Sequence, residues 1–135
     1  MGNTSTWIAV IDDDEGIRRA LLRLLRSAGM EAHAFSSGKK FLTSRCLNRP
    51  ACILIDLQMP EISGFEVIEK LQVFDPELPV IVLTGQDVSE EQKKDRLGRV
   101  LRILHKPVHD IELFNTISLA LNTKPTDSQT IYKDR

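Results

Sequence analysis

The chain alternates between short apolar runs and helical periodicity throughout most of its 135 residues. The apolar runs have strand length, are rich in β-branched residues, and cover residues 7–11, 32–35, 51–55, 80–83 and 100–104. Such runs are typical of strands buried on both faces of a parallel sheet. Because segments with helical spacing separate them, the pattern predicts an α/β fold made of five β-α units. In this doubly wound, three-layer arrangement, helices cover both faces of one five-stranded parallel sheet.

Apolar stripes define four of the expected helices. They consist of Ile17, Leu21, Leu24 and Ala28; of Phe41 and Leu42; of Val67, Ile68 and Leu71; and of Ile111, Phe114, Ile117 and Leu121. Gly29 is a C-terminal signal for the first helix, Ser36 or Ser37 is placed to cap the second, and Pro76 requires the third to end before it. These boundaries predict helices of ordinary length.

The segment between the fourth and fifth apolar runs breaks the pattern. From Ser89 to Arg96 it reads SEEQKKDR and contains no apolar residue. A helix there gains little from packing, so we expect it to be short, mobile or stabilised by a partner. Residues 89–99 are accordingly predicted to be the least ordered folded segment.

Length and composition indicate one folded domain over residues 6–122, with a disordered start at 1–5 and a polar tail or linker start at 123–135. A formal net charge of −1 argues against direct nucleic-acid binding. No apolar run approaches the roughly 18 residues of a membrane span. Two cysteines form no disulfide framework, which favours a reduced, cytoplasmic location. Cys46 and Cys52 are interpreted as packing residues, and the three histidines (His33, His105 and His109) as non-ligands.

Polar residues follow the ends of four predicted strands: Asp12, Asp13 and Asp14; Asp56; Thr84; and Lys106. Ligands of open α/β sheets bind at the carboxyl ends of the strands, so these side chains are expected to converge. Two carboxylates about 4 Å apart repel by roughly 4 kcal/mol at an effective dielectric near 20. A lysine or a divalent cation relieves that repulsion, and oxygen-only ligands favour a hard ion such as Mg²⁺. Asp56 beside two cations is therefore a candidate nucleophile toward a phosphoryl group.

Four short motifs in order carry a family resemblance: VIDDDEGIR, LIDLQMPEISGFE, VIVLTG and LHKP. Over roughly residues 6–121 the sequence resembles the CheY-like receiver domains of two-component response regulators. Its wording is closest to receivers of the FixJ and NarL type, which precede a helix-turn-helix output domain. The resemblance implies a flavodoxin-like sheet of order 2-1-3-4-5.

The resemblance also implies a phosphoryl and metal site. Asp56 is expected to accept a phosphoryl group from a sensor histidine kinase, a phosphotransfer protein or a small phosphodonor. Asp13, Asp56 and the backbone carbonyl of Gln58 are expected to hold Mg²⁺ or Mn²⁺, with Asp12 assisting through water. Such a domain turns over no separate substrate; it catalyses its own phosphorylation and autodephosphorylation.

Further residues are implied in switching. Lys106 is expected to pair with the acylphosphate, next to a cis bond to Pro107, and the Thr84 hydroxyl is expected to swing toward the phosphoryl group. Gln58 and Gln86 are expected to flank the attacking water and to tune the lifetime of the phosphorylated state.

The output side departs from the family pattern. The switch position three residues before the lysine, usually Phe or Tyr, is Ile103, and the usual Ala-Gly-Ala is replaced by residues 98–100, Gly-Arg-Val. The family implies that phosphorylation promotes a homodimer through the fourth helix, fifth strand and fifth helix. With these departures, the readout surface is expected to be unusual.

Other classes fit less well. A haloacid-dehalogenase-type phosphatase needs a second acid two residues after the nucleophile, where this chain has Gln58. A dinucleotide-binding domain needs a G-x-G-x-x-G motif after the first strand, and a flavodoxin needs a phosphate loop there, where this chain has acids. The remaining alternative is a pseudo-receiver, a phosphorylation-independent protein-interaction module.

Overall fold

The structure is a computed structural model that describes residues 6–44 and 48–122. The predicted disordered start at 1–5, the predicted tail at 123–135 and Cys46 lie outside these ranges. The described chain alternates strands and helices in the order β1 (Trp7–Ile11), α1 (Glu15–Ser27), β2 (Glu31–Phe35), α2 (Gly38–Ser44), β3 (Cys52–Asp56), α3 (Gly64–Phe74), β4 (Val80–Thr84), α4 (Glu90–Arg96), β5 (Arg102–His105) and α5 (Asp110–Asn122).

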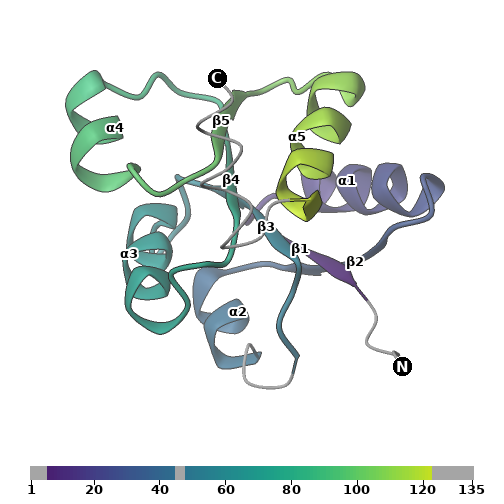
Figure 1. Ribbon diagram of the computed structural model, residues 1–135, viewed down its shortest axis with the longest axis horizontal. Helices are drawn as coiled ribbons and strands as arrows, with labels where there is room; N and C mark the ends of the chain where they lie inside the picture. Colours follow the sequence, from purple (N-terminus) through teal and green to yellow (C-terminus); the bar gives the residue numbers. More distant parts are fainter. Residues whose placement is uncertain (1–5, 45–47, 123–135) are drawn as a thin grey trace.

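All strand pairs are parallel, and the sheet order is β2-β1-β3-β4-β5, which confirms the predicted topology. Figure 1 shows α1 and α5 on one side of the sheet and α2, α3 and α4 on the other. The chain order reverses between β1 and β3, and this is where a doubly wound sheet opens a crevice at its carboxyl edge. The topology therefore places a ligand site beyond the ends of β1 and β3.

Two apolar clusters hold the three layers together. The central strands β1, β3 and β4 are buried at every position, as their continuous apolar runs predicted. Phe41 and Leu71 belong to the cluster beneath α2 and α3, and Leu25 and Ile117 belong to the cluster beneath α1 and α5. Each face of the sheet is thus sealed by helices, and the polar strand ends remain at its rim.

The buried side of α1 differs slightly from the predicted stripe. Leu21 and Leu25 are the buried residues, whereas Leu24 is only half-buried and Ala28 is the exposed C-cap. Gly29 follows with φ of 84°, a left-handed conformation that favours glycine. The predicted helix end was correct, and Ile17 and Leu21 pack on the core as predicted, whereas Leu25 takes the buried place predicted for Leu24.

The fifth β-α unit shows two further differences. Strand β5 begins at Arg102 rather than at residue 100, because the Val100 amide donates to the Leu97 carbonyl and closes a turn there. In α5 the predicted anchor Ile111 is 75% exposed, and Leu113 is buried instead. The expected stripe was therefore wrong at its first position.

Helix α4 is a short helix of seven residues, as predicted, and none of its side chains is buried. A reciprocal capping box starts it, in which the Ser89 hydroxyl accepts from the Gln92 amide and the Gln92 side chain accepts from the Ser89 amide. The buried apolar residues Val88 and Leu97 flank the helix. Capping and these two flanks define α4, while its own sequence contributes no apolar face.

Candidate functional site

The predicted site residues meet at the carboxyl edge of the sheet. Asp12 and Asp56 lie at the ends of β1 and β3, Thr84 ends β4, and Lys106 follows β5. Asp12, Asp56 and Thr84 are buried, and Lys106 is partly buried. Convergence of these side chains follows directly from parallel pairing, because four neighbouring strands end at the same rim.

Three carboxylates form a cluster that fits a divalent cation. Asp12, Asp13 and Asp56 each offer an oxygen, and these oxygens lie within 4.8 Å of one another. Asp13 is exposed, so the cluster has an open side, while Asp12 is only 2% exposed. The donor set consists of oxygen alone, which suits Mg²⁺ with several retained waters. These residues therefore fit the metal implied by the family.

Lys106 is the positive charge within this cluster. Its Nζ lies 2.9 Å from Asp12 Oδ2 and 3.7 Å from Asp56 Oδ1. Burial raises the pKa of the Asp56 carboxyl above its ordinary value, and the charges of Asp12 and Asp13 act in the same direction, whereas Lys106 and the backbone amide of Gln58 lower it. Burial and the neighbouring acids therefore destabilise the charged form of Asp56, and binding of a second cation beside it would be favourable.

Asp12 is held at every polar atom. Its amide donates to the Phe35 carbonyl at 3.1 Å, and its carbonyl accepts from Arg18 Nη1 at 2.9 Å. Oδ1 accepts from the Asp14 amide at 2.9 Å, and Oδ2 accepts from Lys106. The role of Arg18 was not predicted; the only signal in the sequence is a basic residue early in the helix that follows the acidic run.

The acidic run therefore serves two purposes. Asp12 and Asp13 face the cluster, whereas Asp14 is the N-cap of α1 and accepts from the Ile17 amide at 3.0 Å. Glu15 lies in the first turn, where a negative charge complements the helix dipole.

Gly64 sets the position of the Asp56 strand end. Its amide donates to the Leu57 carbonyl at 2.9 Å, and a Cβ built on Gly64 would collide with the Asp56 carbonyl oxygen. Only glycine permits this approach of α3 to the end of β3. The third helix thereby fixes the backbone that carries the candidate nucleophile.

Thr84 is fully buried and tied to the loop that follows it. Its Oγ1 accepts from the Gln86 amide at 3.2 Å, and its carbonyl accepts from the Lys106 amide at 2.8 Å. The bond between Lys106 and Pro107 is cis, as the family resemblance implied. The hydroxyl thus bonds the loop that leads to α4.

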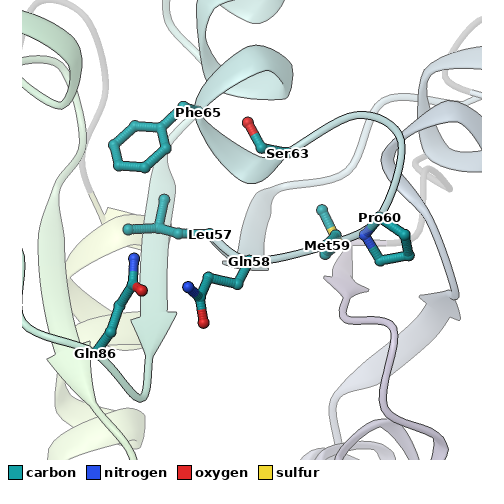
Figure 2. A pocket seen from close by; sticks show the side chains of 7 residues that line it. All are labelled: Leu57, Gln58, Met59, Pro60, Ser63, Phe65 and Gln86. Atoms are coloured by element: carbon teal, nitrogen blue, oxygen red, sulfur yellow. The ribbon is translucent and has the colours of Figure 1, made fainter.

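The two predicted glutamines share one open cavity of about 530 Å³. Figure 2 shows the carboxamides of Gln58 and Gln86 pointing into the same space, with Leu57 and Phe65 beside them. Gln58 is exposed and Gln86 is half-buried, so water reaches both. Ile103, at the predicted switch position, is half-buried against the cluster beneath α3.

Cys52 lies away from this chemistry. It is buried in β3, and burial raises the pKa of its thiol to about 12. The thiolate needed for nucleophilic or redox chemistry is therefore absent at neutral pH, which agrees with its predicted packing role.

Comparisons with known proteins point to one family. The family model described as "Response regulator receiver domain" matches residues 8–118. Response regulator protein TodT of Pseudomonas putida is 34% identical over 128 residues, covering 93% of this chain and 55% of TodT. Transcriptional regulatory protein FixJ of Azorhizobium caulinodans is 33% identical over 115 residues, covering 84% of this chain and 54% of FixJ.

Solved structures agree. A response regulator receiver protein from Burkholderia phymatum superposes with a TM-score of 0.75 at 32% identity, covering 89% of this chain and 98% of that one. The present chain spans about half the length of the curated relatives TodT and FixJ. Within the described residues, no helix combines the length and the apolar character needed to cross a bilayer.

Proposed function

Because the chain belongs to the response regulator receiver domain family, we propose that it receives a phosphoryl group on Asp56 from a sensor histidine kinase or a phosphotransfer protein. The observation that carries this proposal is the convergence of Asp56 with two further carboxylates and Lys106 at the sheet edge. The domain then extends over residues 6–122 and acts in the cytoplasm, where such kinases present their phosphohistidine.

In the transfer step, a carboxylate oxygen of Asp56 attacks phosphorus. The P–N bond of phosphohistidine breaks and its electrons leave with the imidazole; with acetyl phosphate, the P–O bond breaks and acetate leaves. Asp13, Asp56 and the Gln58 carbonyl would hold Mg²⁺, or Mn²⁺ in its place, with Asp12 assisting; the bound metal would offset negative charge on the phosphoryl oxygens. Lys106 lies close enough to Asp56 to stabilise the same charge from the side of β5.

The response begins at Thr84. Its hydroxyl accepts from the Gln86 amide, and we propose that it instead donates to a phosphoryl oxygen once Asp56 is modified. Gln86 then loses a partner, and the loop leading to α4 rearranges. The change is a population shift driven by bonds available only in the phosphorylated state.

Output beyond this domain also belongs to the proposal. The matched region covers only 55% of TodT and 54% of FixJ, so we propose that an output domain reads the switch, as in longer regulators of this kind. A homodimer through α4, β5 and α5 is the expected form of the phosphorylated protein. Sedimentation with and without beryllofluoride tests it, and an unchanged monomer would contradict it.

The rival function is a phosphorylation-independent interaction module. That class is expected to lose an acid, the threonine or the lysine, whereas this chain retains all of them: Lys106 contacts Asp12 and Asp56, and Thr84 ends the neighbouring strand. Incubation with acetyl phosphate and Mg²⁺, followed by intact mass measurement, separates the two functions. We expect one phosphoryl increment in the wild type and none in Asp56→Asn. A beryllofluoride titration accompanies the mass measurement, because beryllofluoride binding tests the aspartate site without requiring a phosphodonor.

A further inference from the structure

Helix α4 is held against α3 by a polar contact. None of its side chains is buried, and its apolar anchors, Val88 and Leu97, lie outside it. Figure 1 shows α4 next to α3, at the margin of the molecule. A seven-residue helix is marginal on its own, so whatever docks it on the body controls its population.

Arg96, the last residue of α4, makes that contact. Its Nε donates to Glu69 Oε2 at 2.8 Å, and its guanidinium carbon lies 4.5 Å from the centre of the Phe65 ring. Both partners belong to α3, one at its first turn and one in its middle. The side chain of Arg96 therefore bridges two α3 residues that lie one turn apart, by a charged hydrogen bond and a cation–π contact.

Phe65 also lies beside the two glutamines that are expected to tune the phosphorylated state. It lines the cavity that contains Gln58 and Gln86, and Figure 2 places its ring beside Leu57 on the side of Gln86. The Gln86 amide in turn donates to Thr84 Oγ1. Thr84 thus bonds Gln86 in the loop that leads to α4, Gln86 and Phe65 line the same cavity, and Phe65 contacts Arg96 at the far end of α4.

We propose that Arg96 is a latch: it keeps α4 docked on Phe65 and Glu69 in the unphosphorylated protein and is released when Thr84 turns to the phosphoryl group. This inference rests on the proposed function and names the contact through which that site controls α4. In the phosphorylated state the loop that contains Gln86 moves, the contact of Arg96 with Phe65 and Glu69 opens, and α4 stays attached through its flanking residues Val88 and Leu97. The latch would couple the phosphorylation site to α4 in a chain whose switch position carries Ile103 instead of the usual Phe or Tyr.

Amide hydrogen exchange of residues 90–97 in the unactivated protein tests the docking. Arg96→Gln is expected to speed exchange about fivefold, because it removes an ion pair and a cation–π contact of modest strength each. The matched control is Lys93→Gln, which makes the same charge change on the same helix but loses only the exposed pair with Glu90. We expect at most about a twofold change in the control. Equal exchange in Arg96→Gln and the control would overturn the latch.

A second variant separates the ring from the charge. Phe65→Leu keeps an apolar side chain but removes the π face, and the double variant Phe65→Leu/Arg96→Gln should exchange no faster than Arg96→Gln alone. Fully additive effects of the two substitutions would show that Phe65 and Arg96 act separately, against the proposal.

Activation with beryllofluoride and Mg²⁺ tests the release. We expect α4 exchange in the wild type to rise to the level of Arg96→Gln, and exchange in that variant to change little. If amide exchange changes in the loop at residues 85–88 but not in α4 of the wild type, the latch is refuted and the proposed function stands. If acetyl phosphate fails to label the wild type at all, the proposed function fails, and the release step fails with it.

Discussion

Lys106 donates a hydrogen bond from Nζ to Asp12 Oδ2 over 2.9 Å, between residues 94 positions apart in the chain. The same ammonium lies 3.7 Å from Asp56 Oδ1. An internal cation therefore occupies the acidic cluster before any metal binds. A bound metal ion and the Lys106 ammonium would therefore compete for the same carboxylates.

Replacing Lys106 should tighten Mg²⁺ binding. In Lys106→Met the metal no longer meets a neighbouring cation and has full use of Asp12, so we expect an affinity gain of about tenfold, which corresponds to roughly 1.4 kcal/mol. Isothermal titration of the unphosphorylated protein measures it. Lys70→Met, at an exposed lysine of α3, is the control and should leave the affinity unchanged. Weaker binding in Lys106→Met would show that the lysine supports the metal site rather than competing with it.

Replacing Arg18 should have the opposite effect. Its guanidinium holds the Asp12 carbonyl at 2.9 Å and thereby the turn that carries Asp13. Loss of a positive charge alone would strengthen Mg²⁺ binding, whereas loss of positioning weakens it. We expect Arg18→Met to lower the affinity about threefold, because a charged hydrogen bond contributes more than a screened charge at this range. Arg19→Met removes an adjacent exposed arginine whose Nη1 lies 3.8 Å from Glu15 Oε2, and it should not weaken binding.

Asp56 should reduce stability at neutral pH in the metal-free protein. Its pKa is raised on folding, chiefly by burial, so the folded state favours the protonated form, and stability is lost as the pH rises through the folded pKa. We expect Asp56→Asn to raise the free energy of unfolding at pH 7 by on the order of 1 kcal/mol, since Lys106 offsets much of the repulsion. The gain should shrink toward pH 4. Urea unfolding in the presence of a chelator measures both.

A matched carboxylate serves as the control for that series. Asp75 accepts two hydrogen bonds from Arg49 at 2.7 and 3.1 Å. Asp75→Asn makes the same chemical change at a favourable ion pair and should lower stability at pH 7 by about 0.5 kcal/mol. A loss of stability in Asp56→Asn, matching that in Asp75→Asn, would mean that Lys106 more than compensates for burial.

The two glutamines should set the lifetime of the phosphorylated protein. Neither amide can act as a general base, so their contribution to hydrolysis is limited to positioning water. We expect Gln58→Ala and Gln86→Ala each to slow autodephosphorylation about two- to tenfold, measured as the decay of the phosphoryl mass increment. Gln72→Ala, at an exposed position of α3, should decay like the wild type. Unchanged rates in both cavity variants would remove these residues from the hydrolysis step.

Much of the fold was predictable because the strands are buried on both faces. The central strands could be predicted without knowing which strands pair, because a continuous apolar segment of strand length is typical of a strand buried on both faces. The helix faces were less certain: Leu25 is buried while the adjacent Leu24 is only half-buried, and Leu113 is buried while Ile111, two residues before it, is exposed. A stripe drawn on apolar residues alone cannot decide which of two apolar residues, one or two positions apart, faces the sheet.

The candidate site was predictable to the extent that strand ends determine it. Asp56 and Lys106 follow buried strands, and parallel pairing brings such ends together whatever the loops do. The contacts of Arg18 and Arg96 were not predictable, because each depends on how far a long side chain reaches across a folded surface. Arg96 and Glu69 are 27 residues apart, and no periodicity relates them.

The central claim is that the phosphoryl group resides on Asp56, and chemical trapping tests it most directly. The protein is incubated with acetyl phosphate and Mg²⁺, and borohydride then reduces any aspartyl phosphate to homoserine with release of phosphate. Peptide mass mapping should find homoserine at position 56 in the wild type, dependent on the phosphodonor and absent from Asp56→Asn. Homoserine at another aspartate, or none in a protein that carries a phosphoryl increment, would contradict the account.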